Sequence, residues 1–413
     1  VNWTGTAASE RYVAGGGDDV LRAGDGDDEV LAGAGNDVLE GGRGNDVLYG
    51  GAGDDTLTDE RLTSTSGQAL YGEAGDDTIT GGGQLYGGEG DDALEVTEEG
   101  DSYYRGRVDG GAGNDTILVD RARTDMVVGG AGNDDLTIAN QVDSIYADAG
   151  DNYYSANSAD GDDTVTLQGS WESYLDVYLG GGDDRLDISG WEGNKGRDTT
   201  FRGQEGDDTF IGRDVTKTNN SQDIFRAGGG DDTLTGGSAN EHLLGGNGND
   251  VIDGNGGNDR LEGGDGRDTL SGGNGSDTLV GGDGVDTLTG GAGQDIFVYT
   301  TRYDGGDTIT DFVAGVDGDL LDFRPLFEKL GYSDADPFGD GWLQLEQVDD
   351  DLVVSLDRDG GGDSFTDSLV TLKGVQEADF TTQNALPAGP LSNSTVNWTG
   401  TAASERYVAG GGD

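Results

Sequence analysis

Apolar and polar residues follow a nine-residue pattern between residues 227 and 298. An apolar residue recurs at one fixed place in each nonapeptide: Leu234, Leu243, Ile252, Leu261, Leu270, Leu279, Leu288 and Phe297. An acidic residue stands two positions before each of them, and the residues before that acid are rich in glycine. Such stretches favour turns, because glycine tolerates positive φ and aspartate bonds its own backbone. The three residues centred on the apolar one predict a short strand whose middle side chain points inward. Two nonapeptides close one coil of about 18 residues, so the pattern predicts an all-β fold, a parallel β-roll or β-solenoid with metal-binding turns.

The pattern also occurs in the first half of the chain. Residues 1–58 contain strict nonapeptides from residue 5 onward, whereas between residues 59 and 226 most glycine-acid turns recur at intervals of about 15 to 24 residues. We interpret 59–226 as an elaborated solenoid that keeps one regular edge and carries longer loops on the other edge. The alternative is a separate β-domain between two regular rolls, 1–58 and 227–298.

The acids at the sixth place of each turn are candidate metal ligands. Stacked coils align these carboxylates with turn carbonyl oxygens, and hard oxygen ligands suit Ca²⁺, whereas no nitrogen or sulfur ligand favours zinc. The predicted metal-binding residues are Asp19, Asp28, Asp37, Asp46, Asp55, Asp77, Asp92, Asp115, Asp134, Asp163, Asp184, Asp208, Asp232, Asp250, Asp259, Asp268, Asp277, Asp286 and Asp295. Glu10 and Glu241 occupy the same place, but the longer side chain is not expected to position its carboxylate equivalently. Asp151-Asn152 forms the weakest turn, since asparagine lacks the charge.

The motif G-G-x-G-x-D-x-(apolar)-x, present as GGNGSDTLV and GGDGVDTLT, resembles the RTX nonapeptide. That resemblance implies a calcium-binding parallel β-roll with multiple Ca²⁺ ions, in a protein exported by bacterial type I secretion. Residues 299–384 resemble the C-terminal secretion-target domain of such proteins through the motif D-x-I-x-D-F-x-x-G-x-D, which begins at Asp307 and ends at Asp317. The resemblance implies a cap on the roll that carries the export signal, although here more sequence follows it.

Residues 299–384 predict one short helix and three strands. RPLFEKL has a proline near its start and Gly331 after its end, as helices do. LQLEQV, DLVVSL and SLVTLKGV predict the strands. Asp357, Asp359 and Asp363 form either a further Ca²⁺ site or an Asx-rich hairpin. Residues 385–395 contain two of the four prolines and predict a linker.

The composition makes folding dependent on cations. The chain has 413 residues, 82 glycines, no cysteine and a formal net charge of −60. Low hydrophobicity with high net charge is typical of disorder, and the regular inward apolar residue argues against disorder only if cations neutralise the acids. Folding and metal binding are therefore expected to be one event. The acidity argues against a nucleic-acid partner, and no apolar stretch is long enough for membrane insertion.

The sequence lacks the components of common enzyme classes. His242 is the only histidine, there is no cysteine, and no G-x-S-x-G motif occurs. A metalloprotease needs two histidines around a glutamate, and a hydrolase triad needs a histidine beside a nucleophile. Carboxylate pairs formally leave a glycosidase open, but calcium ligation accounts for nearly all of them. We therefore expect no enzymatic activity.

Two outward-facing residue classes suggest minor alternatives. Threonines flank many inward residues, as at Thr287 and Thr289, and a flat threonine array could bind ice, although threonine is also a common strand residue. Trp171 and Trp191, with nearby tyrosines, could form a sugar platform, although core or interface packing explains them as well.

The chain repeats its own beginning. Residues 396–413 are identical to residues 1–18, which places the start of another solenoid after the linker. Tandem copies or an artificial duplication explain this, and tandem copies favour a filament that propagates head to tail. We expect an extracellular or cell-surface structural protein, a filament, coat or adhesin stalk, whose partners are its own copies. The alternatives are an adhesin module that binds glycans or cells, and the secretion tail of a larger enzyme.

Overall fold

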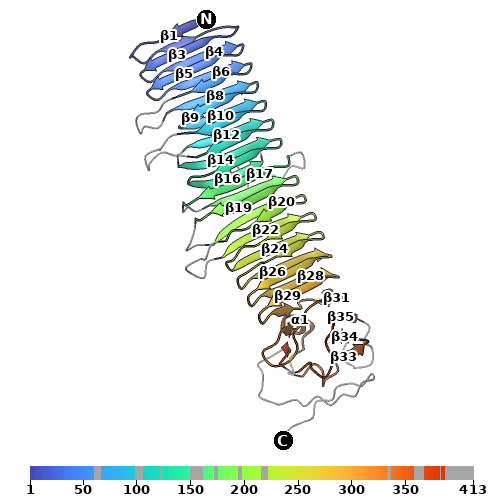
Figure 1. Ribbon diagram of the computed structural model, residues 1–413. Helices are drawn as coiled ribbons and strands as arrows, with labels where there is room; N and C mark the ends of the chain where they lie inside the picture. The colour runs from blue at the N-terminus through green and yellow to red at the C-terminus, as the bar shows by residue number, and fades with distance from the viewer. Residues whose placement is uncertain are drawn as a thin grey trace. The chain divides into compact units, whose positions relative to one another are not determined.

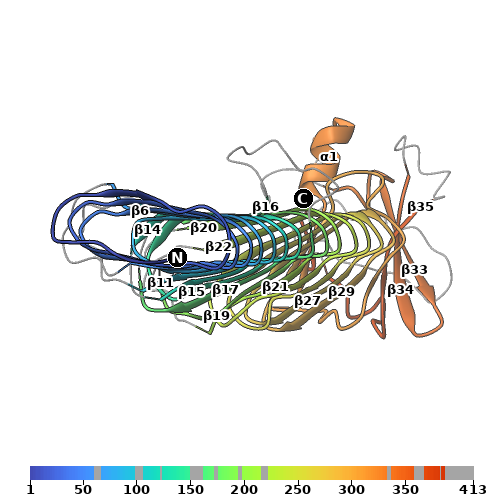
Figure 2. The same cartoon turned by 90° about the horizontal axis from the view of Figure 1, so that it is seen from above.

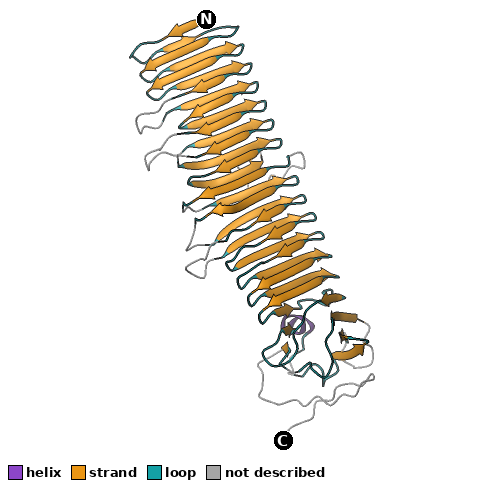
Figure 3. Ribbon diagram, viewed as in Figure 1, coloured by secondary structure: helices purple, strands orange, loops and turns teal. Residues whose placement is uncertain are grey.

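The computed structural model describes residues 1–59, 67–97, 106–120, 123–148, 161–171, 175–193, 198–214, 222–332, 336–357, 367–381 and 383–386. These residues form two compact units, one within residues 1–213 and one within residues 222–386. Each unit is built almost entirely from strands, and the second contains one short helix (Figure 3). The predicted all-β parallel solenoid is confirmed. None of the described helices is long and apolar enough to cross a membrane.

Residues 1–213 form a solenoid with two stacks of parallel strands (Figure 1). One stack contains β1 (Asn2–Thr4), β3 (Val20–Asp25), β5 (Val38–Arg43), β7 (Thr56–Thr58), β9 (Thr78–Gly81), β11 (Ala93–Val96), β13 (Thr116–Val119), β15 (Asp135–Ile138), β17 (Thr164–Gly169), β19 (Arg185–Trp191) and β21 (Thr209–Ile211). The other contains β2 (Arg11–Val13), β4 (Glu29–Ala34), β6 (Val47–Ala52), β8 (Ala69–Ala74), β10 (Gln84–Glu89), β12 (Arg107–Ala112), β14 (Thr124–Ala131), β16 (Val142–Asp148), β18 (Asp176–Gly181) and β20 (Thr199–Glu205). Figure 2 shows the stacks as two walls, with β6, β14, β16 and β20 in one and β11, β15, β17, β19 and β21 in the other.

The inward apolar residues set the register of this solenoid. Leu21, Leu39 and Leu57 pair across β3, β5 and β7, and all three are fully buried. The same pairing continues through the irregular region in the column Ile79, Leu94, Ile117, Leu136, Val165, Leu186 and Phe210. The described strands between residues 69 and 211 therefore extend the same coil stack as residues 1–58, while the number of residues per coil varies.

Residues 222–322 form a second set of coils. One stack contains β23 (Thr233–Thr235), β25 (Val251–Asp253), β27 (Thr269–Asn274), β29 (Thr287–Ala292) and β31 (Asp307–Ile309). The other contains β22 (Asp223–Gly229), β24 (Glu241–Asn247), β26 (Arg260–Gly266), β28 (Thr278–Gly284), β30 (Ile296–Val298) and β32 (Leu320–Asp322). Many strands are twice the predicted length, because ladder pairing continues through the first residues of the turn, as in Gly264 with Gly282.

The remaining described elements follow the last coil. Helix α1 (Arg324–Leu330) ends at Gly331, which has φ 73° and donates its N–H to Glu328 O at 3.2 Å. The strands β33 (Leu343–Val348), β34 (Asp351–Leu356) and β35 (Asp367–Leu372) are antiparallel, whereas β35 and β36 (Ala385–Leu386) pair parallel with β31 and β32. The predicted helix and three strands are present.

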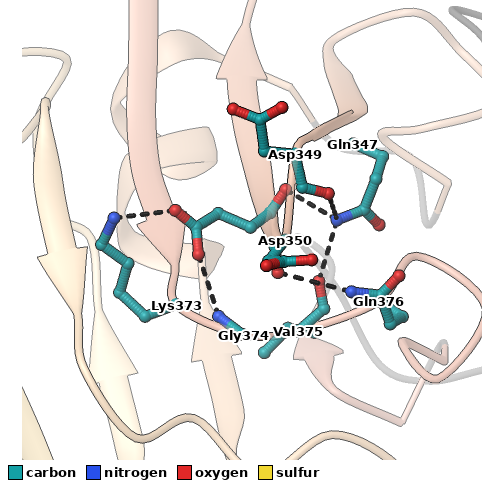
Figure 4. A network of polar contacts seen from close by, with 8 residues as sticks. Gln347, Asp349, Asp350, Lys373, Gly374, Val375 and Gln376 are labelled. Carbon is teal, nitrogen blue, oxygen red and sulfur yellow. Dashed lines mark hydrogen bonds and ion pairs between the residues drawn. The ribbon is translucent and has the colours of Figure 1, made fainter.

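A polar network fixes the β33–β34 turn (Figure 4). Gln347 Nε2 donates to the carbonyl oxygens of Asp351 at 2.9 Å and Val375 at 3.2 Å. The Lys373 ammonium lies 2.7 Å from Asp351 Oδ2, and this hydrogen bond is the largest influence that lowers the pKa of Asp351. The network ties the turn to the chain that leaves β35.

Trp171 and Trp191 are buried in the protein rather than exposed on its surface. Trp191 is fully buried and Trp171 is 8% exposed, with ring centroids 5.1 Å apart. The Arg213 guanidinium lies 4.4 Å from the Trp191 ring centroid. A sugar platform needs exposed ring faces, so the described geometry favours the packing interpretation.

The threonines do not form an uninterrupted array. In the outward column that contains Thr78 and Thr116, Ala93 lies between them and Asp135 follows. A flat ice-binding surface would need a continuous row, so this column gives the ice-binding alternative little support.

The turn geometry predicts that glycine substitutions differ by position. Gly275 has φ 144°, and a Cβ there would collide with the carbonyl oxygen of Gly257 in the adjacent coil. Gly272 begins the same turn at a place where Ala23 and Ala32 occur in other turns. We expect Gly275→Ala to lower the free energy of unfolding by more than about 2 kcal/mol, from backbone strain and collision, and Gly272→Ala to lower it by less. Urea unfolding in calcium measures both; equal effects would contradict the prediction.

Candidate metal centre

The sixth-place acids form hydrogen-bonded columns along both units. Each backbone N–H donates to the carboxylate of the equivalent acid one coil later, as from Asp37 to Asp55 Oδ1 at 2.7 Å. One column of the first unit contains Asp19, Asp37, Asp55, Asp77, Asp92, Asp115, Asp134, Asp163, Asp184 and Asp208. The shorter column contains Glu10, Asp28 and Asp46.

The second unit has two such columns. One contains Asp232, Asp250, Asp268, Asp286 and Asp307; the other contains Glu241, Asp259, Asp277, Asp295 and Asp319. The structure therefore places every predicted metal-binding aspartate in a column.

The second carboxylate oxygen is the group that points to a metal. The Oδ2 atoms of Asp37, Asp92, Asp163, Asp259 and Asp277 are buried and accept no hydrogen bond, and these side chains are at most 2% exposed. Burying an ionised oxygen without a partner costs several kcal/mol or more, roughly, because its hydration is lost. A bound cation supplies the missing interaction.

A backbone oxygen lies near several of these unpartnered oxygens. A Cβ placed on Gly272 would lie 2.5 Å from Asp277 Oδ2 and 2.6 Å from the carbonyl oxygen of Gly290, one coil later. At Gly254 the corresponding distances are 2.7 Å to Asp259 Oδ2 and 2.6 Å to Gly272 O. The donor set is thus carboxylate and carbonyl oxygen, which is the chemistry Ca²⁺ prefers.

The site does not consist of clustered side chains. No group of three or more acidic, histidine or cysteine side chains that could hold a metal occurs among the described residues. Each turn contributes one sixth-place carboxylate, so the backbone must provide most ligands. At Gly272 the space between these two oxygens is open.

Burial raises the pKa of the column acids. Desolvation is the largest cause at Asp134, with a pKa of about 8, and at Asp163, with a pKa of about 9; neighbouring column aspartates raise both further. The backbone hydrogen bond to each Oδ1 opposes the shift. Without a cation, the fold favours protonated carboxyls.

The two glutamates behave differently from the aspartates. The Glu10 carboxylate accepts from the Thr6 N–H and hydroxyl, both at 2.8 Å, and so turns toward its own loop. Glu241 accepts from Gly237 N–H at 3.1 Å. Both carboxylates therefore bond within their own turns, as the longer side chain permits.

Sequence reasoning missed several polar groups. Asp307 and Asp319 end the columns of the second unit, and the spacing from Asp286 and Asp295 could have indicated them. A second, exposed ladder runs through the fifth place of the turns in the opposite direction, with Asn36 N–H donating to Asp18 Oδ1 at 3.0 Å. The Asn-Asp and Asp-Asp pairs that recur in the sequence could have indicated this ladder. Asn152, Asp359 and Asp363 lie outside the described residues.

Comparison with known proteins identifies these turns. The family model of the RTX calcium-binding nonapeptide repeat matches residues 4–39, 31–58, 69–84, 218–252, 235–270 and 271–299. The fold and turns therefore define a calcium-binding β-solenoid. These parts of the chain are copies of the RTX calcium-binding nonapeptide repeat.

Two solved structures resemble the chain. The AlgE6R3 subunit of the Azotobacter vinelandii mannuronan C5-epimerase is 26% identical, with 43% of this chain and 92% of that chain covered and a TM-score of 0.26. A hyperactive, Ca²⁺-dependent, β-helical antifreeze protein from an Antarctic bacterium is 19% identical, with 72% and 87% covered and a TM-score of 0.33. No curated protein matches the chain.

Calcium removal should unfold the chain. Chelation leaves buried carboxylate oxygens and a formal charge of −60 uncompensated. Circular dichroism should show loss of β-structure with chelator and recovery with Ca²⁺, whereas equimolar Mg²⁺, which demands octahedral geometry, should restore less. Retention of the β-signal after exhaustive chelation would contradict calcium-dependent folding.

The calcium-free chain should become more ordered on acidification. The unfolded carboxyls titrate near 3.8, and the folded pKa values rise to about 6 at Asp268, 7 at Asp55 and 8 at Asp134. Because the folded state binds protons more tightly, this contribution is full below the unfolded pKa and is lost as pH rises through the folded values. With chelator, the β-signal should increase as pH falls from 8 to 5; no increase would contradict this linkage.

Proposed function

We propose that the chain is a non-enzymatic structural unit of a secreted filament, surface coat or adhesin stalk, made rigid by calcium. The observation that carries this proposal is the continuous column of carboxylates. In the first unit it runs from Asp19 to Asp208 along one edge of the coil stack. Every coil shares polar contacts with its neighbours, so a bound ion stiffens the whole stack.

The sequence repeat supports assembly in tandem. Residues 396–413 repeat residues 1–18 without a difference. Solenoid units contact mainly their sequence neighbours, so joined units can extend in one direction. The expected partners are further copies of the same unit.

The available side chains support a structural role better than an enzymatic one. The single histidine, His242, binds Glu262 Oε1 at 2.8 Å, and Arg260 binds the same oxygen at 2.6 Å. This group is an ion-pair network on a strand rather than a base beside a nucleophile. Extracellular calcium would keep the unit folded after export and not inside the cell, which fits a secreted protein.

Joined units should form an extended particle whose length increases in equal steps. Chains of two and three copies, repeated at the 395-residue period, should each lengthen by the same amount in calcium and collapse to a heterogeneous coil with chelator. Negative-stain electron microscopy and small-angle scattering measure this length. Compact particles, or units that lengthen the chain unequally, would contradict the proposal.

A further inference from the structure

Asp59 stands where the other turns of its column have glycine or alanine. The shorter acid column of the first unit runs through turns that begin with Ala23 and Gly41, and the next coil places Asp59 beside Gly41. Asp59 directly follows β7, and its N–H donates to Thr80 O at 3.1 Å. The acid column itself ends one turn earlier, at Asp46.

The Asp59 carboxylate reaches the space in which a metal ligand is expected. Its side chain is 3% exposed, and a Cβ on Gly41 would lie 2.6 Å from Asp59 Oδ1 and 2.7 Å from Asp46 Oδ2. In a regular turn, the backbone carbonyl of the next coil occupies this place, as Gly290 O does beside Gly272. Here a side-chain carboxylate takes that position.

This arrangement brings two buried carboxylates together. Asp46 is fully buried and forms no ion pair within the described part of the chain, and its carboxylate lies within hydrogen-bonding reach of the Asp59 carboxylate. Two desolvated carboxylates repel each other unless they share a proton or bind a cation. A divalent cation with oxygen preference satisfies both at neutral pH.

A buried polar side chain without a hydrogen-bond partner, Gln68, lies near the backbone carbonyl of Asp59. Gln68 is 1% exposed, and neither atom of its amide has a hydrogen-bond partner. A Cβ on Gly81 would lie 3.5 Å from Asp59 O and 3.6 Å from Gln68 Nε2. Polar atoms without partners are rare in interiors, and the Gln68 amide is a second unsatisfied polar group on this edge of the coil.

We propose that Asp59 is a calcium ligand that closes the shorter column, where it shares one ion with Asp46. The ion fixes β5 and β7 at the point where the nonapeptide pattern ends on this edge. The proposal rests on calcium binding by the repeats and is independent of filament formation. It assigns a ligand outside the nonapeptide motif, at a place where the other turns of the column have glycine or alanine.

Hydrogen exchange in the full chain tests this assignment during a calcium titration. In Asp59→Ala and in Asp46→Asn, the calcium concentration that half-protects β5 and β7 should rise about 10-fold or more, as expected from loss of ligand support. The double variant should show little further rise, because either change removes the same ion. Protection of β27 and β29 should not change.

Asp25→Asn is the matched control, because Asp25 is an exposed acid on the same edge. It removes one charge and should leave the calcium midpoint of β5 and β7 unchanged. A crystal structure in saturating calcium should show an ion between Asp46 and Asp59. If the two acids share a proton instead, Asp59→Ala will increase protection without calcium and leave the calcium midpoint unchanged. That result, or a crystal without the ion, overturns the proposal.

Discussion

The buried carboxylate column is the interaction on which the rest of the fold depends. Most column aspartates use Oδ1 to accept a hydrogen bond from a backbone N–H of the adjacent coil, and this bond orients Oδ2 into the protein, as at Asp277. The bond alone cannot stabilise the coil, since desolvation of the other oxygen costs more than one hydrogen bond returns. The free energy of burying the carboxylate becomes favourable only when a cation binds. A chain with a formal charge of −60 can therefore form a tightly packed stack and yet depend on its surroundings for stability.

Backbone geometry explains why the turns are so uniform. Glycines at the second and fourth places have φ values such as 100° at Gly273 and 144° at Gly275, which bring turn carbonyls close to the preceding coil. A side chain at Gly275 would collide with backbone, whereas the second place holds Glu73, Gln204 or Asn255 at positive φ in some turns, and the first place accepts alanine in others. The inward residue is equally constrained, since a column such as Leu21, Leu39 and Leu57 has no exposed surface. The bound ion, the turn geometry and the apolar core therefore all require the same period, and inserted residues are confined to the edges of the coil stack.

The sequence predicts this periodic part well and the non-periodic part poorly. The inward residue and the acid two positions before it determine strand direction, register and column membership, so the apolar residues and the acids could be placed from spacing alone. Asp59 could not be placed, because its role arises from a coil contact across residues that do not follow the motif. The fifth-place ladder was visible as Asn and Asp residues, but its direction depends on backbone geometry. The helix after Phe323 was predictable from Pro325 and Gly331, whereas the parallel contact of β35 with β31 was not.

Asp311 and Asp59 stand at the same place of a turn, but their carboxylates contact different groups. Asp311 follows Gly290 in its column as Asp59 follows Gly41, and both replace the residue that begins a turn. The Asp311 carboxylate accepts from Gly290 N–H at 2.9 Å and from Gly291 N–H at 2.8 Å, so backbone donors satisfy both of its oxygens. Asp59 instead has one oxygen beside Oδ2 of Asp46. The first arrangement closes a strand edge with hydrogen bonds and needs no ion. The second brings like charges together, and its stability at neutral pH depends on a cation.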